Sequence, residues 1–457
     1  MQLIPRSHSK ALLAIALVCT VTSAIAEETK QGFLSTFESA FSHDPRLKQA
    51  FHKHQAERED ANISAANLLP SVQINANYQY ENSDNIYTDE NSSFYEQSNE
   101  RSGGELIDKI YRVTIQQPLF NYSAYKGYQR DKAYAASSAL RYERSKQELI
   151  YKVAEQYLRV LLAAHEVFLN EKKLTALELK QSQADRAQEL GVGDQLSVLK
   201  VKASKDLARS DLLQAKSQLS DATTLLSNYT GTNVHVPDEW VQNSQDINLE
   251  LLTGTQEDWL EKVSDNLSIK EARKNILQEE LNLSSRKGEH FPTLKLNIGY
   301  LDRRSDDEFR VREDMTAAIE FSMPLYSGGR TQANIRKARS RLLASQSQLD
   351  YIISEKEQQI KLSYNRLISF KERLEALVET RESSKGYLEA AERQLSLNLG
   401  QQISVLDART QLVDTQIQFA KTLNDYLLSD LILRLESGDL TEQRLHEYDE
   451  LFSTPSN

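Results

Sequence analysis

The chain contains two copies of one unusual unit. A proline that precedes an alternating apolar and polar segment stands at Pro70 and again at Pro292, and a Pro-Leu-aromatic triplet begins at Pro118 and again at Pro324. A glycine turn of the same pattern occurs once in each copy, near residues 193 and 400. Each copy of an internal repeat is one structural unit that packs on its neighbour, so the duplication limits the fold more than any single residue does.

Residues 1–26 have the layout of a secretory signal peptide. Two basic residues, Arg6 and Lys10, precede a short apolar run and a small-residue motif at 24–26. The apolar run is shorter than the roughly 20 residues of a membrane-spanning helix, which disfavours a retained anchor. The segment holds the only cysteine, Cys19, whose preceding residues do not favour a lipoprotein site. The mature chain is therefore expected to have no disulfide and to be stabilised by packing.

Composition argues against several classes of function. The formal net charge is −11, and loss of two basic residues with the signal peptide makes it −13. A chain this acidic is not expected to bind nucleic acid, whose phosphates require clusters of Lys and Arg. The sequence has no P-loop, no His-Glu-x-x-His motif and no nucleophile elbow. We therefore expect no enzyme activity, no cofactor and no metal site.

Four segments alternate between apolar and polar residues, as strands with one apolar face do. They lie at 70–80, 111–119, 292–300 and 318–325, and only Gln117 interrupts an apolar face. Each is close to the roughly 9–11 residues of a tilted transmembrane strand. A soluble sheet with one wet face is the alternative. Because four strands enclose little core, we favour a membrane β-barrel.

Long helices account for most of the remaining chain. Residues 121–190 and residues 330–399 each contain a single glycine and no proline. At 1.5 Å per residue, a helix of either length spans about 105 Å. A return segment follows each turn, at 194–228 and 401–435, and a further helix is expected at 34–66. These lengths predict two short helices placed end to end beside each long one.

These patterns divide the chain into five segments. After the signal peptide, a first repeat is expected over 27–231 and a second over 256–435, each with a helix, two strands and a long helical hairpin. Residues 232–255 and 436–457 are expected to lie part way along the helices, where the short helices meet. The predicted fold is mainly α-helical, with four transmembrane strands in each chain.

The two glycine turns are candidate functional sites at the far end of the hairpins. The candidate residues are Gly193, Asp194, Ser197 and Lys200 in the first copy and Gly400, Gln401, Ser404 and Asp407 in the second. A purely structural explanation is a glycine that caps the end of one helix before the next helix begins. Docking or gating is an equal alternative, because both copies keep the motif. Asp407 occupies the position of Lys200, and a ring of such carboxylates in a lumen would favour cations.

Two further motifs are explained by structure rather than by ligand binding. We expect Pro118 in the first copy, and Pro324, Gly328 and Gly329 in the second, to mark turns from a strand into a helix. The glycines are compatible with a phosphate cradle, but the segment lacks the Walker lysine. Positions 52 and 54 are both histidine, but residues two apart do not face each other on a helix, which disfavours a metal site.

Several of these motifs together resemble the TolC family of outer-membrane channel proteins, over essentially the whole mature chain. Residues 323–330 look like the family's strand-to-helix signature, residues 395–408 look like its periplasmic turn, and a Leu-Pro pair before a strand is typical of it. The resemblance implies a homotrimer in which each chain lends four strands to one 12-stranded barrel. A helical tunnel would continue this barrel across the periplasm.

The same resemblance implies partners and a location. A periplasmic adaptor protein would dock at the helical tips, and an inner-membrane transporter, of the ABC or the proton-driven type, would supply the energy. The chain would be a passive exit duct in the outer membrane of a Gram-negative bacterium, surrounded by lipid. Family members serve type I protein secretion or small-molecule efflux, and the sequence does not separate the two.

The resemblance is incomplete at the gate. Where the family's archetype has a tyrosine and two aspartates in the second turn, this chain has Leu395, Ser404 and Asp407, and Ser197 replaces the aspartate of the first turn. The tyrosine-aspartate latch is therefore not carried over. A constriction at Asp407 is the part of the gate that the resemblance still implies.

Two other classes of protein share part of the pattern. A periplasmic adaptor has helical hairpins, but it should also show lipoyl-like and β-barrel modules, which the sequence lacks. A coiled-coil structural or adhesin protein of the cell envelope needs no paired alternating strands. An export conduit accounts for both the helices and the strands.

Overall fold

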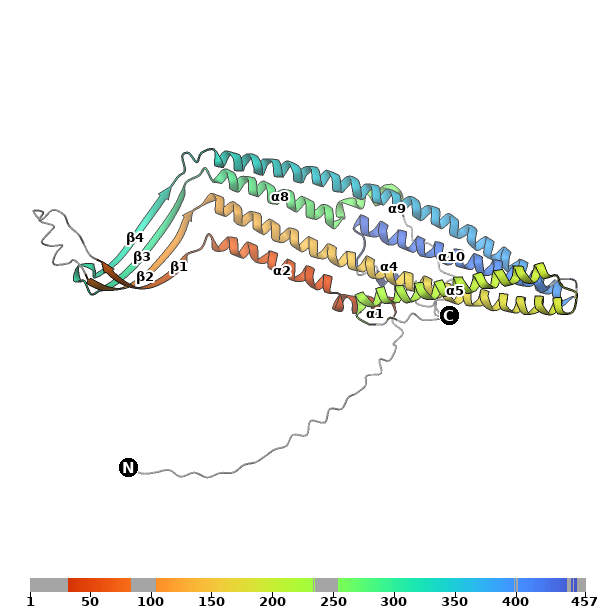
Figure 1. The fold of residues 1–457 in the computed structure, drawn as a ribbon. Helices are drawn as coiled ribbons and strands as arrows, with labels where there is room; N and C mark the ends of the chain where they lie inside the picture. Colours follow the sequence, from red (N-terminus) through yellow and green to blue (C-terminus); the bar gives the residue numbers. More distant parts are fainter. Residues whose placement is uncertain are drawn as a thin grey trace, which may run out of the picture.

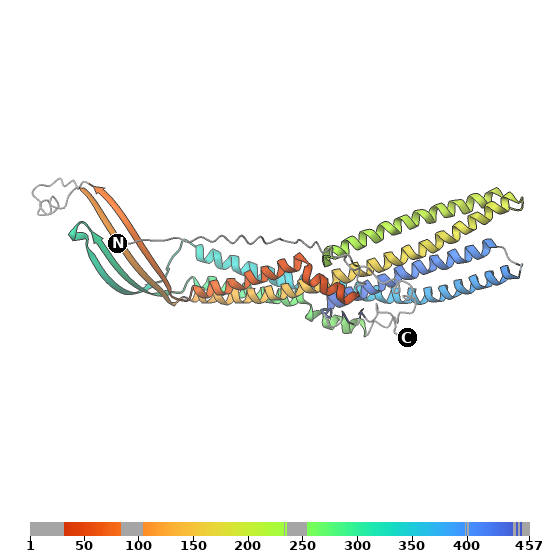
Figure 2. The same cartoon turned by 90° about the horizontal axis from the view of Figure 1, so that it is seen from below.

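The computed structural model describes residues 32–83, 104–232, 234, 254–397, 399, 402–441, 445–446 and 448–449. The expected signal peptide, the loop at 84–103 and most of the segments 232–255 and 436–457 lie outside the described residues. The described chain is elongated, with a β-sheet at one end and the tips of two helical hairpins at the other (Figure 1, Figure 2).

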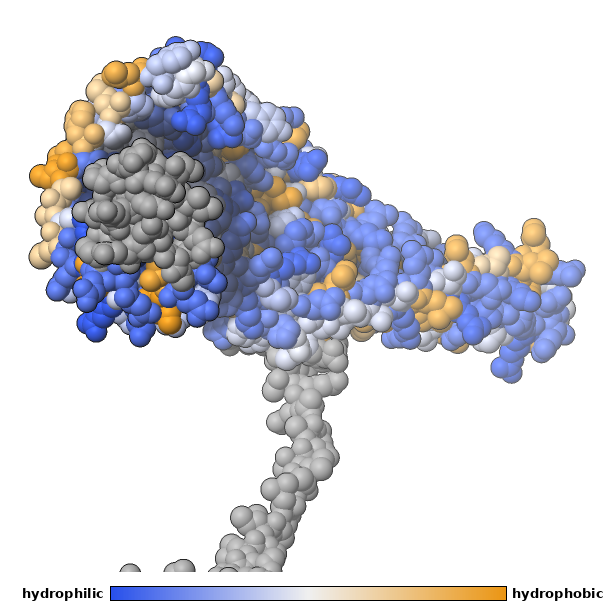
Figure 3. All heavy atoms as spheres, turned by 60° about the vertical axis from the view of Figure 1, so that its left-hand side comes forward, coloured by the Kyte–Doolittle hydropathy of each residue, from blue (hydrophilic) through white to orange (hydrophobic). Residues whose placement is uncertain are grey.

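Four antiparallel strands form one sheet in the order β1-β2-β3-β4. They are β1 (Ser71–Ser83), β2 (Gly104–Phe120), β3 (Thr293–Ser305) and β4 (Arg312–Ser322). The register places apolar residues opposite one another, such as Ile74 and Val113, so that they share one face. That face is open to the surroundings, since Ile74 is 74% exposed and Ile319 is 66% exposed. Around the strands, hydrophobic residues gather on the outer surface while the hollowed side is hydrophilic (Figure 3).

Gln117, which interrupts the apolar pattern of β2, lies where this strand leaves the regular ladder. The register between β2 and β3 shifts between Pro118 and Phe120. A proline has no N–H to donate to a ladder, so such a shift is expected there. The Gln117 side chain donates from Nε2 to the carbonyl oxygens of Leu68, at 3.1 Å, and Pro118, at 2.7 Å. The polar residue is therefore satisfied by nearby backbone.

The helices pair as their lengths predict. They are α1 (Phe33–His43), α2 (Pro45–Ala66), α4 (Tyr122–Glu189), α5 (Gln195–Thr230), α7 (Gln256–Glu261), α8 (Leu267–Gly288), α9 (Arg330–Ser396) and α10 (Gln402–Ser437), with short 3-10 turns η2 (Lys262–Asp265) and η3 (Glu308–Arg310). Helices α2 and α5 follow one another along α4, and α8 and α10 follow one another along α9 (Figure 1). Within the described part of the chain, no helix has an apolar stretch sufficient to cross a membrane.

The helix expected at 34–66 is divided into α1 and α2. The break falls at Asp44, because a residue that precedes a proline is disfavoured in a helix while Pro45 is tolerated at the first helical position. Asp44 Oδ1 accepts a hydrogen bond from the Leu47 N–H at 2.8 Å and caps α2. Asn266 caps α8 in the same way, through the Ser268 N–H at 2.8 Å. The two copies thus begin their strand-proximal helices alike.

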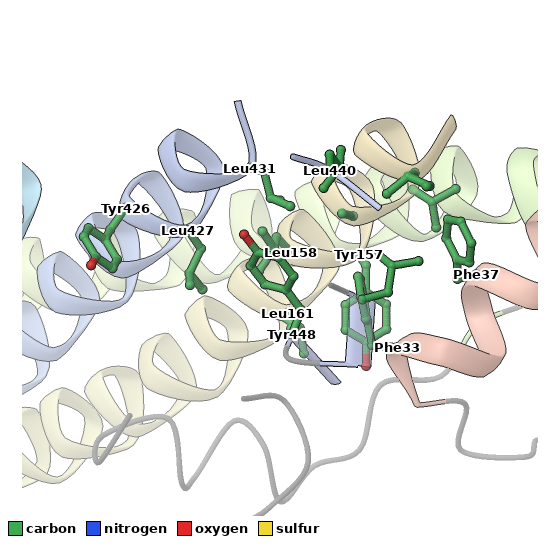
Figure 4. Packing of buried hydrophobic residues seen from close by; sticks show 14 of the residues in the cluster. Phe33, Phe37, Tyr157, Leu158, Leu161, Tyr426, Leu427, Leu431, Leu440 and Tyr448 are labelled. Atoms are coloured by element: carbon green, nitrogen blue, oxygen red, sulfur yellow. The ribbon is translucent and has the colours of Figure 1, made fainter. Parts of the chain in front are cut away.

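The main hydrophobic core lies near the middle of α4, where α1, α10 and the described part of the C-terminal segment meet it (Figure 4). Tyr157 and Leu158 of α4 are each 2% exposed. The Phe33 ring meets the Tyr157 ring edge-on, with centroids 5.3 Å apart. Because α4 is enclosed on several sides here, its apolar stripe is broader than on an ordinary surface helix.

One ion pair is buried in this core. Arg434 Nε donates to Asp430 Oδ2 at 2.8 Å, with the two side chains 6% and 0% exposed, and the Tyr448 hydroxyl donates to the same oxygen. Burial by itself would lower the pKa of Arg434, but the Asp430 carboxylate outweighs it and raises this pKa above its usual value. Burial, and then Asp430, raises the pKa of Tyr448. Both groups therefore remain donors and tie the C-terminal segment to α10.

Candidate functional site

The first glycine turn joins α4 to α5 at the end farthest from the sheet (Figure 1). Gly191 has a φ of 73°, the left-handed conformation that glycine favours after a helix. The Gly193 N–H donates to the Ala187 carbonyl at 2.9 Å, and a Cβ added at Gly193 would lie 2.9 Å from Gln188 N. The backbone path therefore requires glycine at 193.

Asp194 and Ser197 are partners within this turn. Asp194 Oδ1 accepts from the Ser197 N–H at 2.6 Å, and Oδ2 accepts from Ser197 Oγ at 3.2 Å. This is the N-cap arrangement that begins α5. Lys200 is exposed, and no ion pair of its ammonium occurs among the described residues. The first turn thus combines local capping with one exposed cation.

Replacing Gly193 by alanine is expected to loosen the first tip, because the new methyl group would press on the backbone at Gln188. Gly386 is the matched control. It lies inside α9 with nothing within 4 Å of an added Cβ, so Gly386→Ala should stabilise the helix by about 0.5–1 kcal/mol. Amide hydrogen exchange should become faster around residue 193 in the first variant and slower around residue 386 in the second. Equal protection at the tip of Gly193→Ala and wild type would contradict the expectation.

In the second turn, Gly400 and Gln401 lie outside the described residues. Ser404 is half-buried near the start of α10. Asp407 is not an isolated carboxylate, because Lys180 Nζ of α4 donates to its Oδ1. The Asp407 side chain is 64% exposed, whereas that of Lys180 is 9% exposed. The structure thus brings Asp407 to a residue of the first repeat that sequence reasoning did not select.

The contact of Lys180 with Asp407 is one of three ion pairs between the described residues of α4 and α10, which we call the α4–α10 ladder. Lys173 Nζ lies 2.9 Å from Asp414 Oδ1, and Lys421 Nζ lies 3.1 Å from Glu166 Oε1. The α4 members are 166, 173 and 180, and their α10 partners are 421, 414 and 407. Each step of seven residues along α4 is matched by seven in the opposite direction along α10. Two antiparallel helices kept in one register produce this spacing.

The ladder fixes how the two hairpins lie against each other. Its α4 side chains are largely buried, at 9–16% exposed, while its α10 side chains are 47–64% exposed. Because one member of each pair remains in solvent, each pair should contribute at most about 1 kcal/mol. In one pair α4 supplies the carboxylate, Glu166, whereas in the other two it supplies a lysine. A shift of α10 by seven residues along α4 would therefore place like charges opposite each other. The ladder therefore specifies register more than it adds stability.

The turns from strand into helix contain the prolines and glycines that the sequence motifs mark. Gly328 and Gly329 have φ values of 63° and 79°, and Gly329 is the N-cap of α9. A side chain at either position would be strained, since left-handed backbone costs ordinary residues about 1–2 kcal/mol. Pro324 lies between the end of β4 and these glycines, and Pro118 lies at the register shift of β2. Both copies thus carry a proline at this turn.

The two histidines of α2 contact different partners. His52 Nδ1 lies 3.2 Å from Gln55 Oε1, whereas His54 Nδ1 lies 2.7 Å from Ser138 Oγ on α4. His54 also stacks on Tyr142. Among the residues that the structure describes, no group of three or more potential metal-ligating side chains is found.

The sequence matches the model of the family described as outer membrane efflux protein, over residues 37–232 and 262–438. The chain belongs to this family. The match covers both copies of the repeat and confirms the resemblance to TolC-type channels. The efflux-protein family consists of outer-membrane channels of Gram-negative bacteria, so this member lies in the outer membrane with its helices in the periplasm.

Several curated proteins resemble this efflux-family member over most of its length. Alkaline protease secretion protein AprF of Pseudomonas aeruginosa is 25% identical over 418 residues, 91% of this chain and 86% of the relative. Proteases secretion protein PrtF of Dickeya chrysanthemi is 22% identical and covers 94% of this chain and 93% of its own. Outer membrane protein TolC of Escherichia coli is 22% identical, and the match covers 98% of this chain and 90% of the relative.

Solved structures share the fold at lower identity. A crystal structure of CusC superimposes with a TM-score of 0.75 at 16% identity and covers 90% of this chain and 92% of its own. The CmeC outer membrane channel of Campylobacter jejuni has a TM-score of 0.74 at 12% identity, and the superposition covers 100% of this chain and 98% of CmeC. The expected architecture of a small sheet and long helical hairpins is therefore confirmed.

Proposed function

We propose that this chain forms the exit duct of a tripartite export system, as a homotrimer that conducts cargo passively and catalyses no reaction. The observation that carries the proposal is the sheet. Its apolar face is exposed, and among the described residues β1 pairs with β2 alone and β4 with β3 alone. Exposed edge strands bind further strands, and closed membrane barrels have at least about eight. Three copies would close a 12-stranded barrel.

The helices support a tunnel below this barrel. Helices α2, α4, α8 and α9 lie side by side in one layer, with α2 and α9 at its edges (Figure 1). A layer with two uncovered edges is completed when α9 of one chain meets α2 of the next. The same rotation that closes the sheet would therefore close the helices, as cyclic symmetry requires.

The hairpin tips fit the docking of a periplasmic adaptor. Large apolar residues are exposed at the first tip, including Val192, 82% exposed, and Leu196, 77% exposed, and at the second, where Leu399 is 80% exposed. Exposed apolar residues gathered at one end of a protein favour contact with a partner. An inner-membrane ABC or proton-driven transporter would supply the energy for export, because a passive duct has no energy source of its own.

We propose that the α4–α10 ladder is the gate contact of this channel. Widening the periplasmic end requires the α9/α10 hairpin to move against the α4/α5 hairpin, which would separate Lys180 from Asp407 and Lys173 from Asp414. Asp194 and Ser197 would serve the gate by shaping the first tip. Adaptor binding at the tips would then favour the state in which the ladder is broken.

The names of relatives favour protein secretion as the cargo class, since AprF and PrtF are both named for protease secretion. Small-molecule efflux is the second candidate, in accordance with the family description. Deletion of the chain should abolish export of extracellular protein, raise drug sensitivity, or both. Complementation by the wild-type gene is the control.

The purified protein should also migrate as a heat-resistant trimer and give single-channel steps in planar lipid bilayers. A coiled-coil structural or adhesin protein would give neither result. A folded protein that is monomeric and never conducts would overturn the proposed function.

A further inference from the structure

A pocket of about 500 Å³ shows which side of the helical layer is concave. Its lining comes from all four neighbouring helices, with Asp60 of α2, Tyr134 of α4, Gln278 of α8 and Arg341 of α9. Side chains from the first and the fourth helix of a layer can line one pocket only where the layer curves around it. This pocket therefore lies on the concave side, which would be the inner wall of the tunnel.

A second pocket, of about 290 Å³, lies on the same side between α2 and α4. The two pockets are adjacent, because the Tyr134 hydroxyl, which lines the first pocket, donates to Oε1 of Glu57, which lines the second, at 2.8 Å. We call the second one the α2–α4 pocket. Its arginine and lysine lining residues are Arg46, Lys53, Arg141 and Arg144.

The α2–α4 pocket has an excess of positive charge in a chain that is acidic as a whole. Glu57 is the only carboxylate among the described lining residues, and Glu271 of α8 and the exposed Glu148 of α4 add two more beside them. Arg141 is held by both, with Nη1 3.0 Å from Glu57 Oε1 and Nε 3.1 Å from Glu271 Oε1. Arg144 Nη1 lies 2.6 Å from Glu271 Oε2. Arg144 Nε also lies 3.3 Å from Glu148 Oε1. All these contacts are made to Arg141 and Arg144, and they leave two cations of the pocket without a carboxylate partner among the described residues.

The two remaining cations are Arg46 and Lys53. Arg46 lies over the ring of Tyr229, 5.6 Å from its centroid, a contact that orients the guanidinium without removing its charge. No ion pair of Lys53 occurs among the described residues. A concave site with low-dielectric walls focuses such charge, which acts over a Debye length of about 8 Å at physiological ionic strength.

We propose that the α2–α4 pocket binds carboxylate groups of the cargo, so that the channel wall favours acidic cargo during passage. This inference rests on the proposed function, because it requires the concave side to line a conduit. A trimer would repeat the pocket three times around the lumen. Acidic segments of a polypeptide and small organic anions share this chemistry, and the experiment below separates them.

The test is the ion selectivity of the full-length protein in planar lipid bilayers under a KCl gradient. Lys53→Glu should lower the ratio of chloride to potassium permeability at least about two-fold, because it places a carboxylate in the pocket. Lys132→Glu is the matched control. Residue 132 lies nine residues from Arg141 on α4, about two and a half turns away, and so faces the opposite side.

The outcomes separate the inference from the proposed function. Channels whose selectivity is changed equally by both variants, or by neither, would overturn the inference and leave the conduit in place. Folded protein that never conducts would overturn both. Current block by a poly-glutamate peptide but not by succinate would assign the pocket to acidic polypeptides, and block by both would assign it to small anions as well. Absence of block by either in wild-type channels would also overturn carboxylate binding.

Discussion

Replacement of Arg434 by alanine is expected to lower the free energy of unfolding by about 3–5 kcal/mol. The change leaves the carboxylate of Asp430 buried without its cation, and that side chain is 0% exposed. The Tyr448 hydroxyl would remain as a donor, but a neutral group does not compensate a buried negative charge. Chemical denaturation followed by circular dichroism, at fixed protein concentration, measures the loss.

Two variants test the explanation. Lys262→Ala removes an ion pair to Asp439 in the same region, but the lysine is 47% exposed, so the loss should stay below about 1 kcal/mol. Asp430→Leu combined with Arg434→Met replaces the buried pair by apolar side chains and should recover most of the stability. A double variant as unstable as Arg434→Ala would show that the loss comes from packing rather than from the unpaired charge.

Reversal of the two tip-proximal lysines, Lys173→Glu with Lys180→Glu, is expected to open the proposed gate. Each substitution places like charges opposite each other at Asp414 and Asp407, so the interhelical contact becomes repulsive. Every 1.4 kcal/mol lost from the closed state raises the open population about ten-fold. Single-channel recording in planar bilayers should show a several-fold higher mean conductance than in the wild-type channel.

The control and the rescue use the same chemistry. Lys216→Glu reverses a pair with Glu171 that joins α4 to α5 within one hairpin, so it should leave the conductance unchanged. Adding Asp407→Lys and Asp414→Lys to the reversed lysines restores opposite charges across the two hairpins and should restore the wild-type conductance. Failure of this rescue in a correctly assembled channel would refute the ladder as the gate contact.

Local chemistry made much of the fold predictable. The strands were visible from alternation alone, because one face of each had to be apolar, and the long helices from the scarcity of glycine and proline. The helix caps were predictable too. Asp44 and Asn266 cap α2 and α8 through their own side chains, and each accepts a hydrogen bond from an N–H no more than three residues further along the chain.

The proposed gate was only half predictable. Gly193, Asp194 and Ser197 act on backbone next to them, and their roles in the turn follow from the motif. Asp407 was selected from the sequence, but its partner was not. Lys180 lies in the other repeat, and opposite charges at seven-residue intervals on the two helices were the signal that could have identified it.

The sequence by itself determined which segments are helices and strands and that the unit occurs twice, but not every boundary: β2 begins at Gly104 rather than at 111, and β4 spans Arg312–Ser322 rather than 318–325. Those properties depend on contacts between residues close in the chain. Only the tertiary structure decided that α4 meets α10 in one register and that Arg46, Lys53, Arg141 and Arg144 gather on the concave side. These placements depend on which faces of distant helices are buried against each other. The periodicity of apolar residues shows how wide the apolar face of a helix is, but not which other helix packs against it.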